Sequence, residues 1–155
     1  MSRGALEGKV VVVVGGTTGL GLAGVHACLA AGARVVAVGP AGSDAGGLGP
    51  ELGGRARLLR GDARDPGTAR AAIRDALSEL GGFDALYHVA GGSGRSFGDG
   101  PLHEISDAGW EETLRLNLGS VFHSCRAAAE QFMAQGTPGS VLSMGSVLSA
   151  SRSSA

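Results

Sequence analysis

Lysine and tyrosine are almost missing from this chain of 155 residues, which has one of each, Lys9 and Tyr87. They lie 78 positions apart, so a mechanism that needs a tyrosine and a lysine close together in the sequence is excluded within these residues. Aromatic residues make up only 4% of the chain, whereas 43% is hydrophobic and 29 residues are glycine. Because the hydrophobic share is too high for disorder and the glycines follow no Gly-X-Y repeat, we expect a globular protein.

The chain also has little net charge, only two cysteines and no long apolar run. The net charge is −1 and the arginines are scattered, which argues against a nucleic-acid surface. Cys28 and Cys125 form no CxxC motif and the four histidines have no metal-ligand spacing, so we expect free thiols, a cytoplasmic setting and no metal. The apolar run Val10–Val14 is too short for a membrane span or a signal-peptide core.

Short β-branched runs alternate with helical patterns along the chain. We expect strands at residues 10–14, 34–38, 57–60, 85–89 and 140–144. Helical spacing predicts helices over residues 19–31, 66–80 and about 107–134, with Asp65 and Ser106 as N-caps and Gly32 as a stop. Residues 39–54 hold seven glycines and two prolines, which predicts a loop with at most a short helix.

This order of elements predicts an α/β fold in which one doubly wound, Rossmann-like parallel sheet has helices on both faces. Its length favours a single domain over residues 1–155. In such sheets ligands bind beyond the carboxyl ends of the strands. The informative residues are therefore those that follow each strand.

A glycine-rich segment, Gly15–Gly21 (GGTTGLG), follows the first strand and opens the first helix. Its glycines permit a tight turn and let a pyrophosphate approach the backbone at the helix N-terminus. A Gly-x-Gly-x-x-Gly match that begins at Gly19 lies largely within the helix, so we reject it as the primary motif. An ordinary glycine-rich turn is the alternative, but the strand before and the helix after favour a dinucleotide cradle.

The spacing Gly-x-x-x-Gly-x-Gly resembles the short-chain dehydrogenase/reductase family. Four further segments resemble the family's motifs in the same order: Gly61–Ala63, His88–Gly92 (HVAGG), Trp110–Phe122 around Asn117, and Gly139–Ser146. The five segments cover the chain from its first strand to Ser146. The resemblance implies an NAD(P)-binding Rossmann domain that contains about five of the family's seven strands and is incomplete at its C-terminal side.

The resemblance implies cofactor-binding and catalytic residues. The cofactor-binding set is Gly15, Thr17, Thr18, Gly19, Leu20, Gly21, Gly39, Asp62, Ala63, Val89, Ala90 and Gly91. The catalytic set is Ser146, which would orient a substrate oxygen, and Asn117, which would belong to a proton relay. Taken without the family, Ser146 is equally a serine that ends a strand.

Asn117 can also be interpreted from the helix pattern alone. Trp110, Leu114, Val121 and Cys125 mark an apolar face of the long helix, and Asn117 lies on the same face. A buried amide there must find hydrogen-bond partners, so the alternative to a relay is an asparagine that bonds to neighbouring backbone.

The chain departs from the family pattern in several places. The family's Tyr-x-x-x-Lys pair is missing, because only nine residues follow Ser146 and neither residue type is among them. Val14 and Val89 stand where the family has threonine and asparagine, so we expect the hydrogen bonds that usually brace the sheet to be missing. Gly39-Pro40 replaces the acid that NAD-specific members carry, which favours NADP, with Thr18 and Ser43 as phosphate contacts.

The leading hypothesis is the cofactor-binding part of an NAD(P)-dependent oxidoreductase that transfers hydride between a nicotinamide and a small carbonyl or alcohol substrate. We expect the loop Arg95–Glu104 to contact substrate, the chain alone to be inactive, and the full-length form to be a homo-oligomer. One alternative is a non-catalytic dinucleotide-binding or interaction module. Another is a fragment without a function of its own, marginally stable and prone to associate through an uncovered strand at 140–144.

Overall fold

Five parallel strands form one sheet in the computed structural model, which describes residues 4–43, 48–49, 54–98 and 100–146. The strands are β1 (Val10–Val14), β2 (Arg34–Gly39), β3 (Ala56–Arg60), β4 (Ala85–His88) and β5 (Ser140–Ser143). Their order is β3-β2-β1-β4-β5, and every neighbouring pair is parallel. The strand order thus reverses between β1 and β4. This confirms the doubly wound sheet, and each predicted strand lies within one residue of its expected ends.

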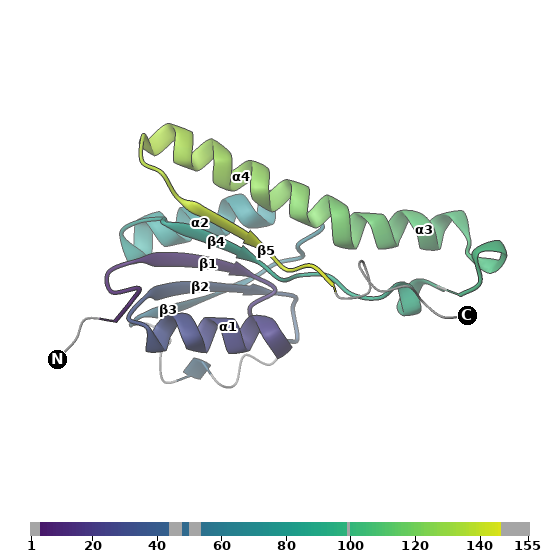
Figure 1. Ribbon diagram of the computed structural model, residues 1–155, viewed down its shortest axis with the longest axis horizontal. Coiled ribbons are helices and arrows are strands. Elements are labelled where there is room, and N and C mark those ends of the chain that lie inside the picture. Colours follow the sequence, from purple (N-terminus) through teal and green to yellow (C-terminus); the bar gives the residue numbers. More distant parts are fainter. Residues whose placement is uncertain (1–3, 44–47, 50–53, 99, 147–155) are drawn as a thin grey trace.

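Helices cover both faces of the sheet (Figure 1). The helix α1 (Gly19–Ala30) lies on one face, and α2 (Pro66–Leu80) and α4 (Ser120–Gln135) lie on the other. The helix α3 (Asp107–Leu114) leads into α4 through a π-helical turn, Arg115–Gly119, and extends past the end of the sheet. Short 3₁₀ turns at Gly94–Phe97 and Leu102–Glu104 precede it.

The predicted capping residues set the starts and ends of the helices. Asp65 accepts a hydrogen bond from the Gly67 N–H at 2.7 Å, and Pro66 occupies the first helical position of α2. Ser106 accepts from the Gly109 N–H at 3.1 Å and caps α3. Gly32 follows α1 with φ of 95°, a left-handed conformation that glycine adopts at little cost.

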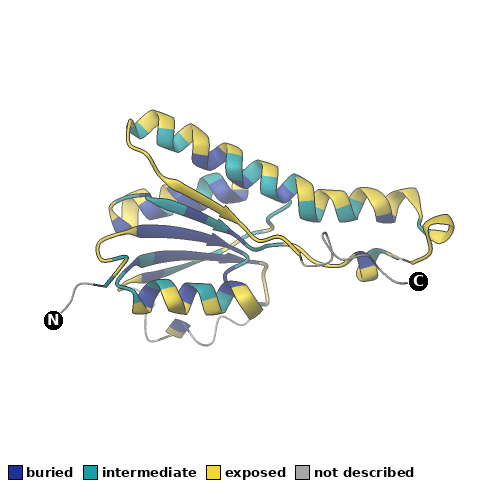
Figure 2. Cartoon of the chain, viewed as in Figure 1, coloured by how far each residue is buried: buried dark blue, intermediate teal, exposed yellow. Residues whose placement is uncertain are grey.

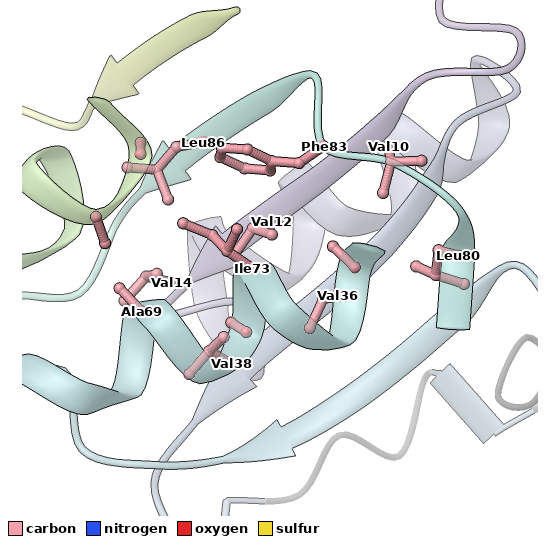
Figure 3. Close-up of a cluster of buried hydrophobic side chains, with 14 residues drawn as sticks. Val10, Val12, Val14, Val36, Val38, Ala69, Ile73, Leu80, Phe83 and Leu86 are labelled. Atoms are coloured by element: carbon pink, nitrogen blue, oxygen red, sulfur yellow. The ribbon is translucent and has the colours of Figure 1, made fainter. Parts of the chain in front are cut away.

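The valines of β1 divide the hydrophobic core between the two faces of the sheet. Val10, Val12 and Val14 belong to a cluster with α2 and α4 (Figure 3), whereas Val11 and Val13 pack with α1. All five are at most 5% exposed. A strand with both faces covered needs apolar side chains in both directions, which explains the unbroken run of valines.

The long helix predicted over residues 107–134 is present but divided, and its predicted apolar face is wrong in part. Trp110 is 56% exposed and Leu114 is 38% exposed, so Asn117 does not lie on a buried face shared with them. The reason is that α3 extends past the sheet, where among the described residues it packs mainly on the turn Gly94–Phe97 and not on a strand (Figures 1 and 2). Four exposed apolar residues at intervals of four form a surface that we call the helix stripe: Trp110, Leu114, Leu118 and Phe122.

The strand β5 forms one edge of the sheet and is exposed along its whole length (Figure 2). Leu142 is 60% exposed and Val141 is 45% exposed, although their side chains leave the strand on opposite faces. An open edge with apolar side chains can pair with another chain. Among the described residues, nothing covers this edge, in agreement with the uncovered strand expected from the sequence at residues 140–144.

We predict that the 155-residue chain associates in solution. Replacing Leu142 by lysine should shift it toward monomer, because a charge on an edge strand disfavours pairing with another chain. Light scattering over a concentration series measures this, and Leu118→Lys tests the helix stripe in the same way. A wild-type chain that is monomeric and melts cooperatively at high temperature contradicts the prediction.

Candidate functional site

A cleft of about 520 Å³ opens at the carboxyl ends of β1, β2 and β4, where the strand order reverses. Eleven of the twelve predicted cofactor-binding residues line it: Gly15, Thr17, Thr18, Gly19, Leu20, Gly21, Asp62, Ala63, Val89, Ala90 and Gly91. The other lining residues are Val14, Val38, Pro40, Gly61, Arg64, Phe97 and Leu116. Phe97 comes from the loop that was expected to contact substrate.

The glycine-rich turn after β1 needs glycine at several positions, because of either backbone conformation or close packing. Gly15 and Gly19 have φ angles of 88° and 50°, in the left-handed region that other residues rarely adopt. A Cβ on Gly21 would overlap the carbonyl oxygen of Gly15. The turn can therefore hold its shape only with glycine here, and it brings the N-terminus of α1 to the cleft.

Gly39, the twelfth predicted residue, does not line the cleft but packs behind it. A Cβ at this position would overlap Oγ1 of Thr17, whose side chain is buried. An acidic side chain at the end of β2 would thus collide with Thr17. Thr17 can therefore occupy its buried position only because residue 39 has no side chain.

The wall opposite the glycine turn is formed by the residues after β4. The Val14 carbonyl accepts hydrogen bonds from the N–H groups of Val89, at 2.8 Å, and Ala90, at 3.0 Å. A Cβ on Gly15 would lie 2.5 Å from the Ala90 nitrogen, so the two backbones nearly touch. The ends of β1 and β4 thus build both sides of the cleft.

Asp62 lies at the mouth of the cleft and is held by an arginine that the sequence analysis missed. Arg64 donates to both carboxylate oxygens of Asp62, with distances from 2.6 to 3.0 Å, and its Nη1 donates to Glu112 of α3 at 3.0 Å. The hydrogen bond from Arg64 is the main reason that the pKa of Asp62 is lowered. The carboxylate is therefore ionised and oriented, and α3 is tied to the cleft.

Asn117 does not line the cleft, but its side chain forms hydrogen bonds with Gly92, the residue that follows the cleft wall. Its Oδ1 accepts from the Gly92 N–H, and its Nδ2 donates to the carbonyls of Gly92 and Thr113, all at 3.0 Å. These are the backbone bonds that one interpretation of the sequence expected. Ser146 also lies outside the lining, three residues after β5, whose end is joined to β4 by the Met144 N–H and the His88 carbonyl at 2.8 Å.

His88 is a buried polar residue beneath the wall, and no pattern in the sequence assigns it a role of its own. It is 1% exposed; Nδ1 lies 3.0 Å from Oγ of Ser124, and Nε2 lies 3.0 Å from the Ala90 carbonyl and 3.2 Å from Oγ of Ser120. Burial lowers the pKa of His88 below the ordinary value of 6.5, an effect that outweighs the opposing bond with Ala90. The ring is therefore neutral at physiological pH.

Arg60 at the end of β3 is a second missed residue. Its Nη1 donates to the carbonyl of Pro40 at 3.3 Å, and to the carbonyl and Oγ of Ser43 at 2.5 and 2.8 Å. Because Gly39 pairs with Arg60 in the sheet, the cation stands beside the position where the acid is missing. Only the pairing of β2 with β3 brings it there, so no local pattern signals it.

The only tyrosine and lysine of the chain lie away from the cleft. Tyr87 in β4 packs against α1, where a Cβ on Gly24 would lie 2.8 Å from its ring. Lys9 pairs with Asp84 at 2.8 Å at the amino ends of β1 and β4, the opposite end of the sheet. Neither residue can reach a ligand in the cleft.

The described part of the chain contains no group of three His, Cys, Asp or Glu side chains placed to hold a metal ion. Its helices include none with the length and apolar character needed to cross a membrane.

We predict that stability falls as the pH drops from about 7.5 to about 5.5, because the unfolded chain protonates His88 while the fold resists it. Among the described residues no carboxylate hydrogen-bonds to the ring, so a charge on it would have no acidic partner. One such group contributes at most about 1.4 kcal/mol per pH unit to the free energy of unfolding. Urea unfolding of the wild type and His88→Gln measures it; equal slopes for the two proteins would refute the prediction.

Comparison with known proteins agrees with the geometry. The family of short chain dehydrogenases matches residues 9–155. The D-threitol dehydrogenase of Mycolicibacterium smegmatis is 33% identical over 144 residues, which are 91% of this chain and 54% of that protein. The 2-dehydro-3-deoxy-D-gluconate 5-dehydrogenase of Escherichia coli is 33% identical over 150 residues, 96% of this chain and 58% of that one.

A solved structure has the same fold. The citronellol catabolism dehydrogenase AtuB of Pseudomonas aeruginosa superimposes with a TM-score of 0.79 at 30% identity, covering 98% of this chain and 62% of that one. The chain spans a little over half the length of the curated relatives it matches. The family match extends over nearly all of its residues, so the chain belongs to the short-chain dehydrogenase/reductase family.

Proposed function

We propose that the chain is the cofactor-binding part of an NAD(P)-dependent oxidoreductase that transfers hydride between the nicotinamide and a carbonyl or alcohol carbon. The observation that carries the proposal is the turn at the end of β1, in which Gly21 leaves no room for a Cβ and α1 begins directly at the cleft. The first N–H groups of a helix have no partner within it, so they can donate to a pyrophosphate.

Successive parts of the cleft lining would hold the successive parts of a dinucleotide. The turn Gly15–Gly21 would hold the pyrophosphate. Asp62, with its ionised carboxylate fixed by Arg64, would accept from the adenine amine, and Ala63 would lie beside it. Val89–Gly91 would form the wall toward the nicotinamide end. When bound, the nicotinamide supplies the redox chemistry, and the protein supplies position and exclusion of water.

We assign the catalytic roles that the family resemblance implies to Ser146 and Asn117. Ser146 would hold the substrate oxygen at the edge of the sheet where β4 and β5 end. Both N–H groups of the Asn117 amide already donate to carbonyls. Its side chain can therefore serve a proton relay only as an acceptor, through Oδ1.

A second candidate function is a dinucleotide-binding module without catalysis. The positions of Tyr87 and Lys9 favour it for these 155 residues, because neither reaches the cleft to act as general acid or to hold a ribose. The two candidates share the binding site and differ in turnover. We accordingly expect the chain alone to bind cofactor and to leave carbonyl and alcohol substrates unchanged.

We predict that the wild-type chain binds NADPH or NADH and that Gly21→Ala weakens both at least about tenfold, because the added methyl group displaces the Gly15 carbonyl. Cofactor fluorescence during titration measures the affinity. Gly82→Ala is the control, since its Cβ would make only an ordinary contact of 3.7 Å with Val10. A wild-type chain that binds neither cofactor overturns the proposed function.

We further propose that the cofactor is NADP rather than NAD. The packing of Thr17 against Gly39 excludes the acid that would repel a 2′-phosphate. Arg60 also lies at this end of the sheet, and its Nη1 donates to the carbonyl and the Oγ of Ser43 in the loop after β2. A guanidinium has further N–H groups on Nε and Nη2 with which to bind phosphate, and Thr18 lines the cleft nearby.

We predict that Arg60→Met weakens NADPH binding by about 10- to 100-fold, the effect of one charged hydrogen bond, and changes NADH binding by less than about threefold. Arg57→Met is a matched control, because Arg57 lies on the same strand and pairs with Glu79 of α2 instead. Titration with both cofactors gives the ratio. An equal loss for NADPH and NADH would remove Arg60 from phosphate recognition.

We propose a small carbonyl or alcohol compound as substrate and a homo-oligomer as the full-length form. The relatives named above are dehydrogenases of a polyol and of a sugar acid. The exposed helix stripe gives the oligomer a surface, since four large apolar side chains on one line favour contact with another subunit. Light scattering of Leu118→Lys tests this surface.

A further inference from the structure

A buried polar cluster joins the end of β4 to α4. It consists of the His88 ring and the hydroxyl groups of Ser120 and Ser124, which lie 32 and 36 positions later in the chain. All three residues are at most 1% exposed. Buried polar groups at this density must satisfy one another or lose stability, so the hydrogen bonds in the cluster define its arrangement.

The hydrogen-bond partners of His88 assign its tautomer. The carbonyl of Ala90, 3.0 Å from Nε2, can only accept, so Nε2 carries the proton. The hydroxyl of Ser120 donates to the Leu116 carbonyl, and its oxygen is thus an acceptor for the same Nε2–H. Nδ1 is then an acceptor for the hydroxyl of Ser124. Each ring nitrogen then has a partner, whereas a proton on Nδ1 alone would leave Nε2 facing the Ala90 carbonyl without a hydrogen. Burial, which lowers the pKa of His88, favours the neutral ring.

The cluster completes a set of bonds that immobilises the cleft wall. The N–H of Ala90 is held by the Val14 carbonyl, and its carbonyl is held by His88. The N–H and carbonyl of Gly92 are both held by Asn117. Both polar backbone groups of these two residues are therefore bonded, and Gly91 is fixed between them at the cleft surface.

We propose that His88 is a positioning residue for cofactor binding: by holding the Ala90 carbonyl against α4, it sets the place of the wall that faces the glycine turn. This inference rests on the proposed function. His88 does not line the cleft, so it acts on the cofactor only through Ala90 and Gly91. His88 thus fixes the end of β4 in a chain whose Val14 and Val89 side chains cannot form hydrogen bonds.

The test compares NADPH affinity in two variants of the 155-residue chain. His88→Leu keeps an apolar side chain of similar size but leaves the Ala90 carbonyl without its partner, and we expect at least about tenfold weaker binding. His88→Gln retains an N–H at about the same reach and should bind within about threefold of wild type. Ile73→Val in α2 is the stability control; it lowers the melting temperature and should leave the affinity of the folded protein unchanged.

A second measurement needs no variant. The nitrogen-15 NMR spectrum of the wild-type ring at about pH 7.5 should show a protonated Nε2 and an unprotonated Nδ1. A ring without a proton on Nε2 overturns the inference, and so does NADPH binding by folded His88→Leu that equals wild type. In either case a wild-type chain that binds NADPH leaves the proposed function standing, whereas a wild type that binds neither cofactor refutes that function itself.

Discussion

The close approach between the ends of β1 and β4 is the constraint on which the cleft depends. The Val14 carbonyl accepts from two successive N–H groups, those of Val89 and Ala90, and this draws the two strand ends together. At that separation Gly15 has no room for a Cβ, since it would lie 2.5 Å from the Ala90 nitrogen. The glycine turn and the opposite wall are thus consequences of one strand pairing, and the N-terminus of α1 faces the space between them.

A parallel sheet supplies strand ends but not a rigid wall, because the chain beyond each strand has left the ladder of backbone hydrogen bonds. In this chain the missing bonds come from side chains of the long helix on one face. His88 reaches α4 through two serines, and Asn117 grips Gly92 from the π-helical turn.

Local patterns were enough for the elements and for most of the cleft lining, whereas contacts between distant segments were not predictable. The valine run of β1, the cap at Asp65 and the spacing of the glycines all act within a few residues, so the sequence shows them directly. His88 and Arg60 depend on which strand lies beside which and on the helix above them. The expected burial of Trp110 was wrong for the same reason, because an apolar pattern does not show whether another element covers the residue.

The scarcity of lysine and tyrosine has a structural counterpart. Lys9 joins the amino ends of β1 and β4 by pairing with Asp84, which also accepts from the Val10 N–H at 2.9 Å. Tyr87 fills the space left by Gly24 in α1. Both residues therefore stabilise the sheet, at sites from which no ligand in the cleft can be reached. Under the proposed function, binding and proton transfer are therefore separable in this fold: the strand ends and helix N-terminus that would hold a dinucleotide form without a tyrosine or lysine at the cleft.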